Sequence, residues 1–222
     1  MTSSITESIT KIRSSLPANV RLIAVTKQVS VAAIRAAYVA GIRDFAESRI
    51  QEALSKQEQL TDLPDICWHF IGHLQSNKAK KALEQFQWIH TCDSLKLAQR
   101  LDRLATDLPS APQICLQVKI MPDPDKYGWS VPELQADLPK LDQCRKLKIK
   151  GLMTILPLGL TEAETLSAFE EVRSLATQIK QQNWSNLDIQ ELSMGMSADY
   201  PFAVQAGATM VRLGRIIFGS RD

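Results

Sequence analysis

Two short turns near the end of the chain, Ser193-Met194-Gly195-Met196-Ser197 and Gly214-Arg215, indicate which fold to expect. The first follows an apolar run and opens a predicted helix, and the second follows the strand-like run Met210-Val211-Arg212-Leu213. In β/α barrels the turns after the last two strands commonly hold a phosphate. Glycine lets backbone N–H groups approach the anion there, and a helix N-terminus adds its dipole. These turns therefore predict a barrel that binds a phosphorylated ligand.

The rest of the chain alternates short β-like runs with amphipathic helical stretches, which is typical of a parallel sheet with helices outside it. Eight such units nearly use up the 222 residues. They predict an α/β protein with a single domain over residues 1–222, a compact (β/α)8 TIM-type barrel. An open doubly wound sheet is the alternative, although no Gly-x-Gly-x-x-Gly motif follows the first strand. The predicted strands are Leu22–Thr26, Asp44–Ala46, Cys67–Ile71, Trp88–Thr91, Gln113–Val118, Ile149–Met153, Asp188–Glu191 and Met210–Leu213.

Helices are predicted between these strands, together with one helix before the first strand. That initial helix, about Thr6–Ser14, is expected to close the bottom of the barrel. The proline-rich segment Met121–Trp129 is expected to be a loop at the carboxyl edge of the fifth strand, where barrel enzymes place their sites. The other predicted helices include Val31–Ala40, Arg49–Gln59, Asn77–Phe86, Leu95–Leu104, Glu162–Gln182 and Ala198–Ala206.

Charge and cysteine usage narrow the functional classes. The formal net charge of +2 provides no electrostatic case for nucleic-acid binding. No stretch is apolar and long enough to span a bilayer, and the first ten residues lack a signal-peptide pattern. The cysteines form no Cys-x-x-Cys pair and are expected to be reduced thiols, which favours the cytoplasm. They are Cys67, Cys92, Cys115 and Cys144.

Lys27 follows the first predicted strand. Period-two alternation puts Ile23, Val25 and Lys27 on one face. Branched residues fill the interior of a barrel, so this face is expected to point inward and to carry Lys27 to the mouth. A lysine desolvated there can lose its proton and attack an aldehyde to form an imine. The alternative is a solvated surface lysine, the commoner environment for this residue.

The same argument from alternation applies to Arg212 in the last predicted strand. It shares a face with Met210, whereas Val211 and Leu213 are expected to meet the outer helices. A buried arginine needs hydrogen-bond acceptors or a π-system. Arg212 therefore either faces a ligand or forms an internal salt bridge with an acid such as Glu47.

Other candidates have simpler interpretations when taken alone. Ser197 is a natural N-cap for the helix that would run to Gly207. Met153 fits packing in a lid or core. His69 and His73 lack a third ligand of suitable spacing, so packing and backbone hydrogen bonds are favoured and no metal site is predicted.

Three features would meet at one place in a closed barrel: an amine after the first strand, phosphate turns after the last two, and an inward arginine. A ligand with an aldehyde, a planar ring with a basic nitrogen and a phosphate would satisfy all three, and pyridoxal 5′-phosphate has these groups. A Schiff-base aldolase for sugar phosphates is an alternative that also uses a lysine and a phosphate site.

The chain also resembles the pyridoxal-phosphate homeostasis proteins, the YggS/PROSC-like family, along nearly its whole length. The matching segments are Ala24–Lys27, Trp68–Lys78, Gly151–Met153, Leu192–Asp199 and Val211–Gly219. The resemblance implies a barrel like the N-terminal domain of alanine racemase. It also implies that Lys27 is the Schiff-base lysine and that Arg212 lies beside the pyridine nitrogen. The cofactor-binding set that it implies is Lys27, Ser48, Met153, Ser193, Ser197, Arg212, Gly214 and Arg215.

The chain departs from the family pattern at two of these positions. The family often has Phe-Gly-Glu-Asn where this chain has Phe45-Ala46-Glu47-Ser48, so Ser48 keeps a hydroxyl but loses the reach and second donor of an amide. Many members have threonine at the position of Arg215. The expected phosphate contact there is consequently the backbone N–H group.

Two points separate a binder of this cofactor from an enzyme that uses it. An arginine beside the pyridine nitrogen keeps that nitrogen unprotonated, which makes the ring a weaker electron sink. Alanine racemases use the same arrangement, but they add a further domain and a tyrosine from a partner subunit. The expected function is a cytoplasmic, monomeric carrier or regulator in vitamin B6 homeostasis and amino- and keto-acid balance. Apo forms of pyridoxal-phosphate enzymes would be its acceptors. A racemase-like enzyme acting on amino acids is the alternative.

Overall fold

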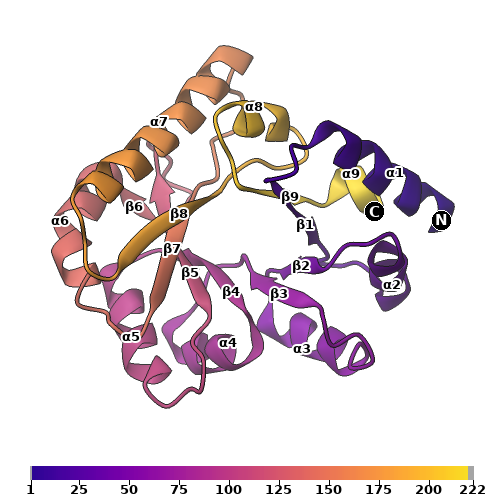
Figure 1. Cartoon of the computed structure of the whole chain (residues 1–222), viewed down its shortest axis with the longest axis horizontal. Helices are drawn as coiled ribbons and strands as arrows, with labels where there is room; N and C mark the ends of the chain where they lie inside the picture. Colours follow the sequence, from indigo (N-terminus) through magenta and orange to yellow (C-terminus); the bar gives the residue numbers. More distant parts are fainter. Residues whose placement is uncertain (1, 220–222) are drawn as a thin grey trace.

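Eight parallel strands close into a barrel in the computed structural model, which describes residues 2–219 (Figure 1). With the short β6, which lies outside the ring, the strands are β1 (Arg21–Val25), β2 (Asp44–Glu47), β3 (Cys67–Phe70), β4 (Trp88–Cys92), β5 (Gln113–Lys119), β6 (Trp129–Ser130), β7 (Lys148–Met153), β8 (Leu187–Ser193) and β9 (Met210–Leu213). Their order is β4-β3-β2-β1-β9-β8-β7-β5, and a further β4–β5 pairing closes the ring. The two-residue β6 is attached to β5. The closure confirms the predicted barrel and excludes the open sheet.

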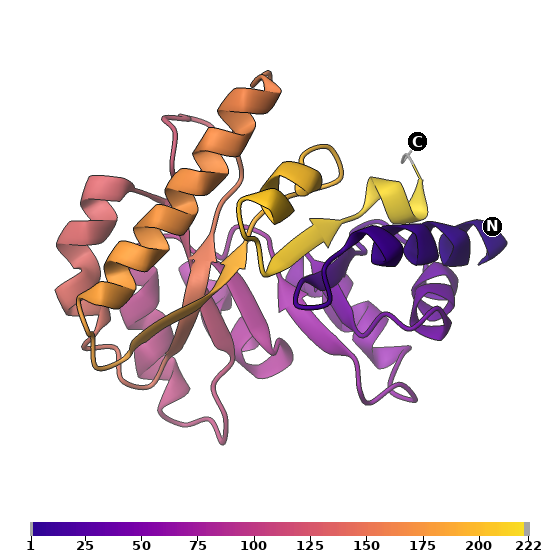
Figure 2. The same ribbon diagram turned by 45° about the horizontal axis from the view of Figure 1, so that its top comes forward.

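The helices form a layer outside the strands (Figures 1 and 2). They are α1 (Thr2–Ser15), α2 (Val31–Val39), α3 (Ile50–Glu58), the short 3-10 helix η1 (Ser76–Lys78), α4 (Ala79–Gln85), α5 (Leu95–Ala105), α6 (Val131–Leu141), α7 (Glu162–Gln181), α8 (Tyr200–Gln205) and α9 (Arg215–Phe218). Within residues 2–219, none of these helices combines the length and apolar character that crossing a membrane requires.

Side chains of β1 alternate between the two sides of the barrel wall, as a period of two requires. Leu22 and Ala24 belong to the large apolar cluster shared with the outer helices. Ile23 and Val25 belong to a smaller inner cluster, which also contains Met153 and Met210. The predicted inward face of the first strand is therefore confirmed.

The first helix, α1, lies in the outer layer and does not close the bottom of the barrel. It packs beside α2 and α9 (Figure 2). Its buried residues Ile5, Ile9 and Ile12 follow helical spacing and join the outer apolar cluster. The expected position was wrong because α9 has only four residues and leaves the wall at β1 and β9 to be covered by another helix.

One helix that the sequence reasoning omitted, α6, follows β6. Its two prolines argue against a helix when the sequence is considered alone, although Pro132 lies in the first turn, where proline is tolerated. Ser130 and Glu133 form a capping box that starts the helix. Pro139 lies inside the helix, in its last turn, where it removes one backbone N–H donor.

Candidate functional site

The candidate site lies at the carboxyl ends of β1, β8 and β9. Lys27 comes two residues after the end of β1, and its side chain is exposed and not enclosed by the barrel wall. Arg212 lies deeper, because its strand register pairs it with Ile23, four residues before Lys27. The mouth thus carries an exposed amine above a buried guanidinium.

Arg212 points into the barrel, as its position beside Met210 predicts. Only 3% of the residue is exposed, and burial lowers the pKa of its guanidinium to about 10, so it stays charged at neutral pH. Its Nη1 donates to Oγ of Ser193 over 2.7 Å, and its Nη2 donates to the carbonyl oxygen of Thr154 over 2.9 Å. These two bonds fix the plane of the guanidinium.

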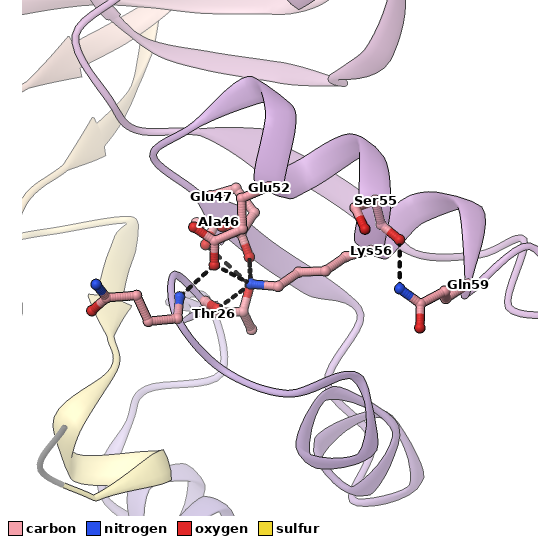
Figure 3. Close-up of polar contacts among 8 residues, drawn as sticks. Thr26, Ala46, Glu47, Glu52, Ser55, Lys56 and Gln59 are labelled. Atoms are coloured by element: carbon pink, nitrogen blue, oxygen red, sulfur yellow. Dashed lines mark hydrogen bonds and ion pairs between the residues drawn. The ribbon is translucent and has the colours of Figure 1, made fainter. Parts of the chain in front are cut away.

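The internal salt bridge between Arg212 and Glu47 is absent. Glu47 alternates with Phe45, which packs in the outer cluster, so its carboxylate lies on the helix side of the wall. There Glu47 pairs with Lys56 of α3 over 2.7 Å (Figure 3). Arg212 and Glu47 are therefore separated by the sheet.

A chain of hydrogen bonds runs through the barrel interior behind Arg212. His69 Nε2 lies 2.9 Å from Oδ1 of Asp44, and its Nδ1 lies 2.9 Å from Nε2 of His90. Nδ1 of His90 lies 2.7 Å from Oγ of Ser193. The two histidines and Ser193 are completely buried.

The groups at the two ends of this chain and the neutral state of both imidazoles together fix the position of each proton. A carboxylate only accepts and an arginine only donates. His69 therefore donates to Asp44, His90 donates to His69, and the Ser193 hydroxyl donates to His90 while it accepts from Arg212. Both imidazoles are neutral in this scheme. Burial supports it, because it lowers the pKa of His69 and lowers that of His90 well below its usual value.

The two predicted phosphate turns lie side by side. Ser197 Oγ lies 3.4 Å from the backbone nitrogen of Gly214 and 3.5 Å from that of Ile216, both of which donate to it. Gly195 has a φ of +91°, and a Cβ there would lie 2.6 Å from Cβ of Ala203. Glycine is consequently required for this turn to approach α8.

Ser197 does not cap the following helix, contrary to the simpler interpretation. Helix α8 begins at Tyr200, two residues later than predicted, and its N-cap residue is Asp199. The Asp199 carboxylate accepts from the backbone N–H of Met196 and holds the turn itself. The hydroxyl of Ser197 is thereby directed to the second turn.

The remaining members of the predicted set have different environments. Met153 is fully buried in the inner cluster. Arg215 is exposed at the start of α9, and Ser48 is half-buried after β2. Gly72 packs directly on Ser48, because a Cβ at residue 72 would lie 1.9 Å from the Ser48 carbonyl oxygen.

His69 and His73 do not converge on one point. His73 lies 3.0 Å from Oδ2 of Asp93 at the mouth and stacks on Tyr127. The hydrogen bonds of both histidines go to side chains, whereas backbone hydrogen bonds were expected; the expected packing is confirmed for His69, which is completely buried and stacks on Trp88. Ligand atoms of Asp44, Cys67 and His69 do lie within 4.8 Å of one another, but the His69 nitrogen is already engaged by Asp44.

His90, which supports Arg212 through Ser193, is the main residue of the site that the sequence analysis did not identify. The signal was present, because period-two alternation places His90 on the same face as Trp88, which lies in the inner cluster. The hydrogen bond to Ser193 spans 103 residues of sequence and depended on barrel closure.

Comparisons with known proteins agree with this geometry. The family model described as "Alanine racemase, N-terminal domain" matches residues 2–222. A pyridoxal phosphate homeostasis protein from Synechocystis sp. is 57% identical over 211 residues, which cover 95% of this chain and 96% of the relative. The chain belongs to the pyridoxal phosphate homeostasis protein family. The member from Escherichia coli K12 is 37% identical over 209 residues, covering 93% of this chain and 88% of its own.

Solved structures show the same relationship. PipY of Synechococcus elongatus, with PLP bound, is 53% identical, has a TM-score of 0.92 and aligns over 97% of this chain and 100% of its own. An alanine racemase from Clostridium difficile 630 aligns over 99% of this chain but only 57% of its own, with a TM-score of 0.80. At 14% identity it shows the shared barrel fold alone.

Proposed function

We propose that this chain binds pyridoxal 5′-phosphate at the mouth of its barrel and acts as a carrier or regulator of that cofactor. Its role lies in vitamin B6 homeostasis and in the balance of amino and keto acids. The observation that carries the proposal is the placement of Lys27, Arg212 and the two turns at neighbouring strand ends. The PLP-bound relative, with 53% identity over nearly the whole chain, supports the same ligand.

The donor groups of the site fit the cofactor. The backbone N–H groups of Gly214 and Ile216 and the hydroxyl of Ser197 lie together, and such turns bind phosphate. Arg212 can only donate, so it suits a ring nitrogen that is an acceptor and carries no proton. When bound, the cofactor supplies an aldehyde that reacts with amines and a ring that accepts electrons.

Lys27 provides the amine for a Schiff base. It would hold the cofactor through this amine, which would condense with the aldehyde carbon and release water. The exposure of Lys27 suits a carrier, because another amine can reach the same carbon and displace the lysine. Met153 from inside the barrel, Ser48 from the β2 end and the backbone of Arg215 complete the proposed contacts.

A racemase-like enzyme acting on amino acids is the competing function. Proton abstraction from a bound amino acid needs a base within hydrogen-bond reach. The two histidines behind Arg212 have all four ring nitrogens engaged and are buried, which makes them supports and not bases. This arrangement favours the carrier.

We further propose that the protein is monomeric and works in the cytoplasm, with apo forms of pyridoxal-phosphate enzymes as acceptors. Free thiols at all four cysteines suit a reducing compartment. Light scattering after gel filtration tests the monomer directly.

Borohydride reduction of the cofactor-loaded protein tests the proposed site. The pyridoxyl group is expected on the peptide that contains Lys27, and Lys27→Ala should abolish the visible imine absorbance. Label found mainly on another lysine would refute the assignment. Absence of imine absorbance in the wild type, together with cleavage of a sugar phosphate, would instead support the aldolase.

A further inference from the structure

A buried ionic cluster joins Thr26, the residue before Lys27, to Glu47 of β2 and to Glu52 and Lys56 of α3 (Figure 3). Nζ of Lys56 donates to Oε1 of Glu47 over 2.7 Å, to Oε1 of Glu52 over 2.6 Å and to the carbonyl oxygen of Thr26 over 2.7 Å. These three contacts use all three donors of the ammonium group. Lys56 is 7% exposed and Glu47 is completely buried.

The cluster holds the backbone on both sides of Lys27. Before it, Thr26 is bonded through its carbonyl oxygen to Lys56, and its hydroxyl donates to Glu47 over 2.6 Å. After it, the backbone N–H of Gln28 donates to Oε1 of Glu52 over 2.5 Å. Lys27 therefore sits between two charge-assisted hydrogen bonds that lead to the same ammonium group.

The backbone after Lys27 adopts a conformation that needs such support. Gln28 has a φ of +59°, in the left-handed region that side-chain-bearing residues rarely occupy. Conformations of this kind persist where the surroundings over-determine them, and they concentrate at functional sites. Two hydrogen bonds hold this conformation: the one from Gln28 to Glu52, and the one from the Val29 N–H to the Thr26 carbonyl oxygen over 2.9 Å, which closes the turn.

The arrangement of charges in the cluster is not the one that fold stability alone would favour. Two carboxylates share one ammonium, and Oε2 of Glu47 has no hydrogen-bond partner among the described residues. Burial raises the pKa of Glu47 and outweighs the bonds from Lys56 and Thr26. An apolar contact between α3 and the wall would avoid this cost.

We propose that Lys56 and Glu52, linked through Glu47 and Thr26, are positioning residues that hold the segment 26–28 so that the Lys27 amine reaches the cofactor aldehyde. The inference rests on the proposed role of Lys27. It assigns to α3 a function in preorganising the covalent bond from the far side of the barrel wall.

Glu52 offers the cleaner test, because its side chain is partly exposed, at 24%. Glu52→Ala removes the acceptor for the Gln28 N–H group, whereas Glu52→Gln keeps an oxygen there. Glu84→Ala is the control for loss of a helix ion pair, since Glu84 pairs with Lys80 at the same four-residue spacing, in the reverse order, on the surface of α4. A second variant, Glu47→Leu with Lys56→Met, replaces both buried charged side chains with apolar groups and deletes both hydrogen bonds to Thr26.

Two measurements apply to every variant. Amide hydrogen exchange of the apo protein measures how readily the backbone of the segment 26–29 opens in the absence of cofactor. Titration with pyridoxal 5′-phosphate, followed by borohydride reduction and peptide mapping, reports affinity and the share of label on Lys27. We expect Glu52→Ala to speed exchange at residue 28 and weaken cofactor affinity, each by about tenfold, the factor for one hydrogen bond to a charged group. Glu52→Gln should recover most of both, and the double variant should resemble Glu52→Ala.

Each outcome decides the matter. Faster exchange at residue 28 with unchanged affinity and labelling would show that the cluster only supports the fold, and the inference would be wrong. Wild-type behaviour of Glu52→Ala or of the folded double variant in both measurements would overturn it too. Label on another lysine in the wild type would instead refute the proposed role of Lys27 itself.

Discussion

The hydroxyl of Ser193 accepts a hydrogen bond from Nη1 of Arg212 over 2.7 Å, inside the barrel. The same hydroxyl donates to His90, so its hydrogen is already used. Ser197, four residues later in the same turn, faces the N–H groups that follow β9. The geometry therefore divides the two serines into one that orients Arg212 and one that faces the proposed phosphate.

This division predicts different effects for two alanine substitutions. Ser197→Ala should weaken binding of pyridoxal 5′-phosphate about tenfold, through loss of one hydrogen bond to a charged group, and leave unphosphorylated pyridoxal nearly unchanged. Ser193→Ala should weaken both ligands alike and lower the free energy of unfolding by about 1–3 kcal/mol, because His90 loses a buried partner. Titrations with the two ligands and urea unfolding measure these effects, and a phosphate-specific loss in Ser193→Ala would contradict the assignment.

The second phosphate turn makes a separate prediction. Gly214 is buried, and its N–H group faces Ser197. A β-branched side chain in Gly214→Val should displace the turn and weaken pyridoxal 5′-phosphate much more than pyridoxal. Equal losses for the two ligands would show that the phosphate lies elsewhere.

His90 should make stability depend on pH. Its folded pKa lies well below the usual value of about 6.5 because burial disfavours the charged imidazole. The unfolded chain then binds a proton that the folded chain does not, so stability is complete above about pH 6.5 and falls as the pH drops below it. His90→Gln should reduce the loss between about pH 7.5 and pH 5 by up to ~2 kcal/mol. Urea unfolding at both pH values measures this, with His73→Gln at the exposed mouth as control; an unchanged loss in His90→Gln would contradict the neutral chain.

The contact between Gly72 and Ser48 predicts a steric effect. A methyl group at residue 72 would overlap the Ser48 carbonyl oxygen, so Gly72→Ala must push the β2 and β3 ends apart. We expect a loss of about 1–3 kcal/mol in the free energy of unfolding, as for overpacked cores. Gly159→Ala is the comparison, because open space surrounds Gly159 and only its φ of +83° is unfavourable. An equal or larger loss in Gly159→Ala would mean that the close approach is not limiting.

The carrier function predicts transfer without turnover. The loaded protein should release pyridoxal 5′-phosphate to an acceptor apoenzyme and show slow or undetectable racemase and decarboxylase activity, since the two histidines behind Arg212 are buried with their ring nitrogens engaged and cannot act as bases. Reactivation of an apoenzyme and chiral analysis of amino acids measure the two arms. Turnover of any single amino acid at rates typical of enzymes, roughly 1–10³ per second, would favour the racemase-like alternative.

Much of the barrel was predictable because its signals are local. Alternation within Leu22–Val25 identified both faces of the first strand, and the same logic turned Arg212 inward. Helix α6 was missed because Pro132 and Pro139 resemble breakers when their positions within the helix are unknown. The place of α1 was missed because it depended on how little of the wall α9 covers.

The sequence by itself determined the eight strands, the two glycine-containing turns and the inner and outer faces of the first and last strands. These follow from the period of two and from local backbone preferences. Only the tertiary structure decided which residues meet: His90 with Ser193, Glu47 with Lys56 in place of Arg212, and Ser197 with Gly214. The alternation of one strand says which way a side chain points. Which residues of other strands lie at the same level of the barrel depends on the stagger with which the closed barrel joins its strands.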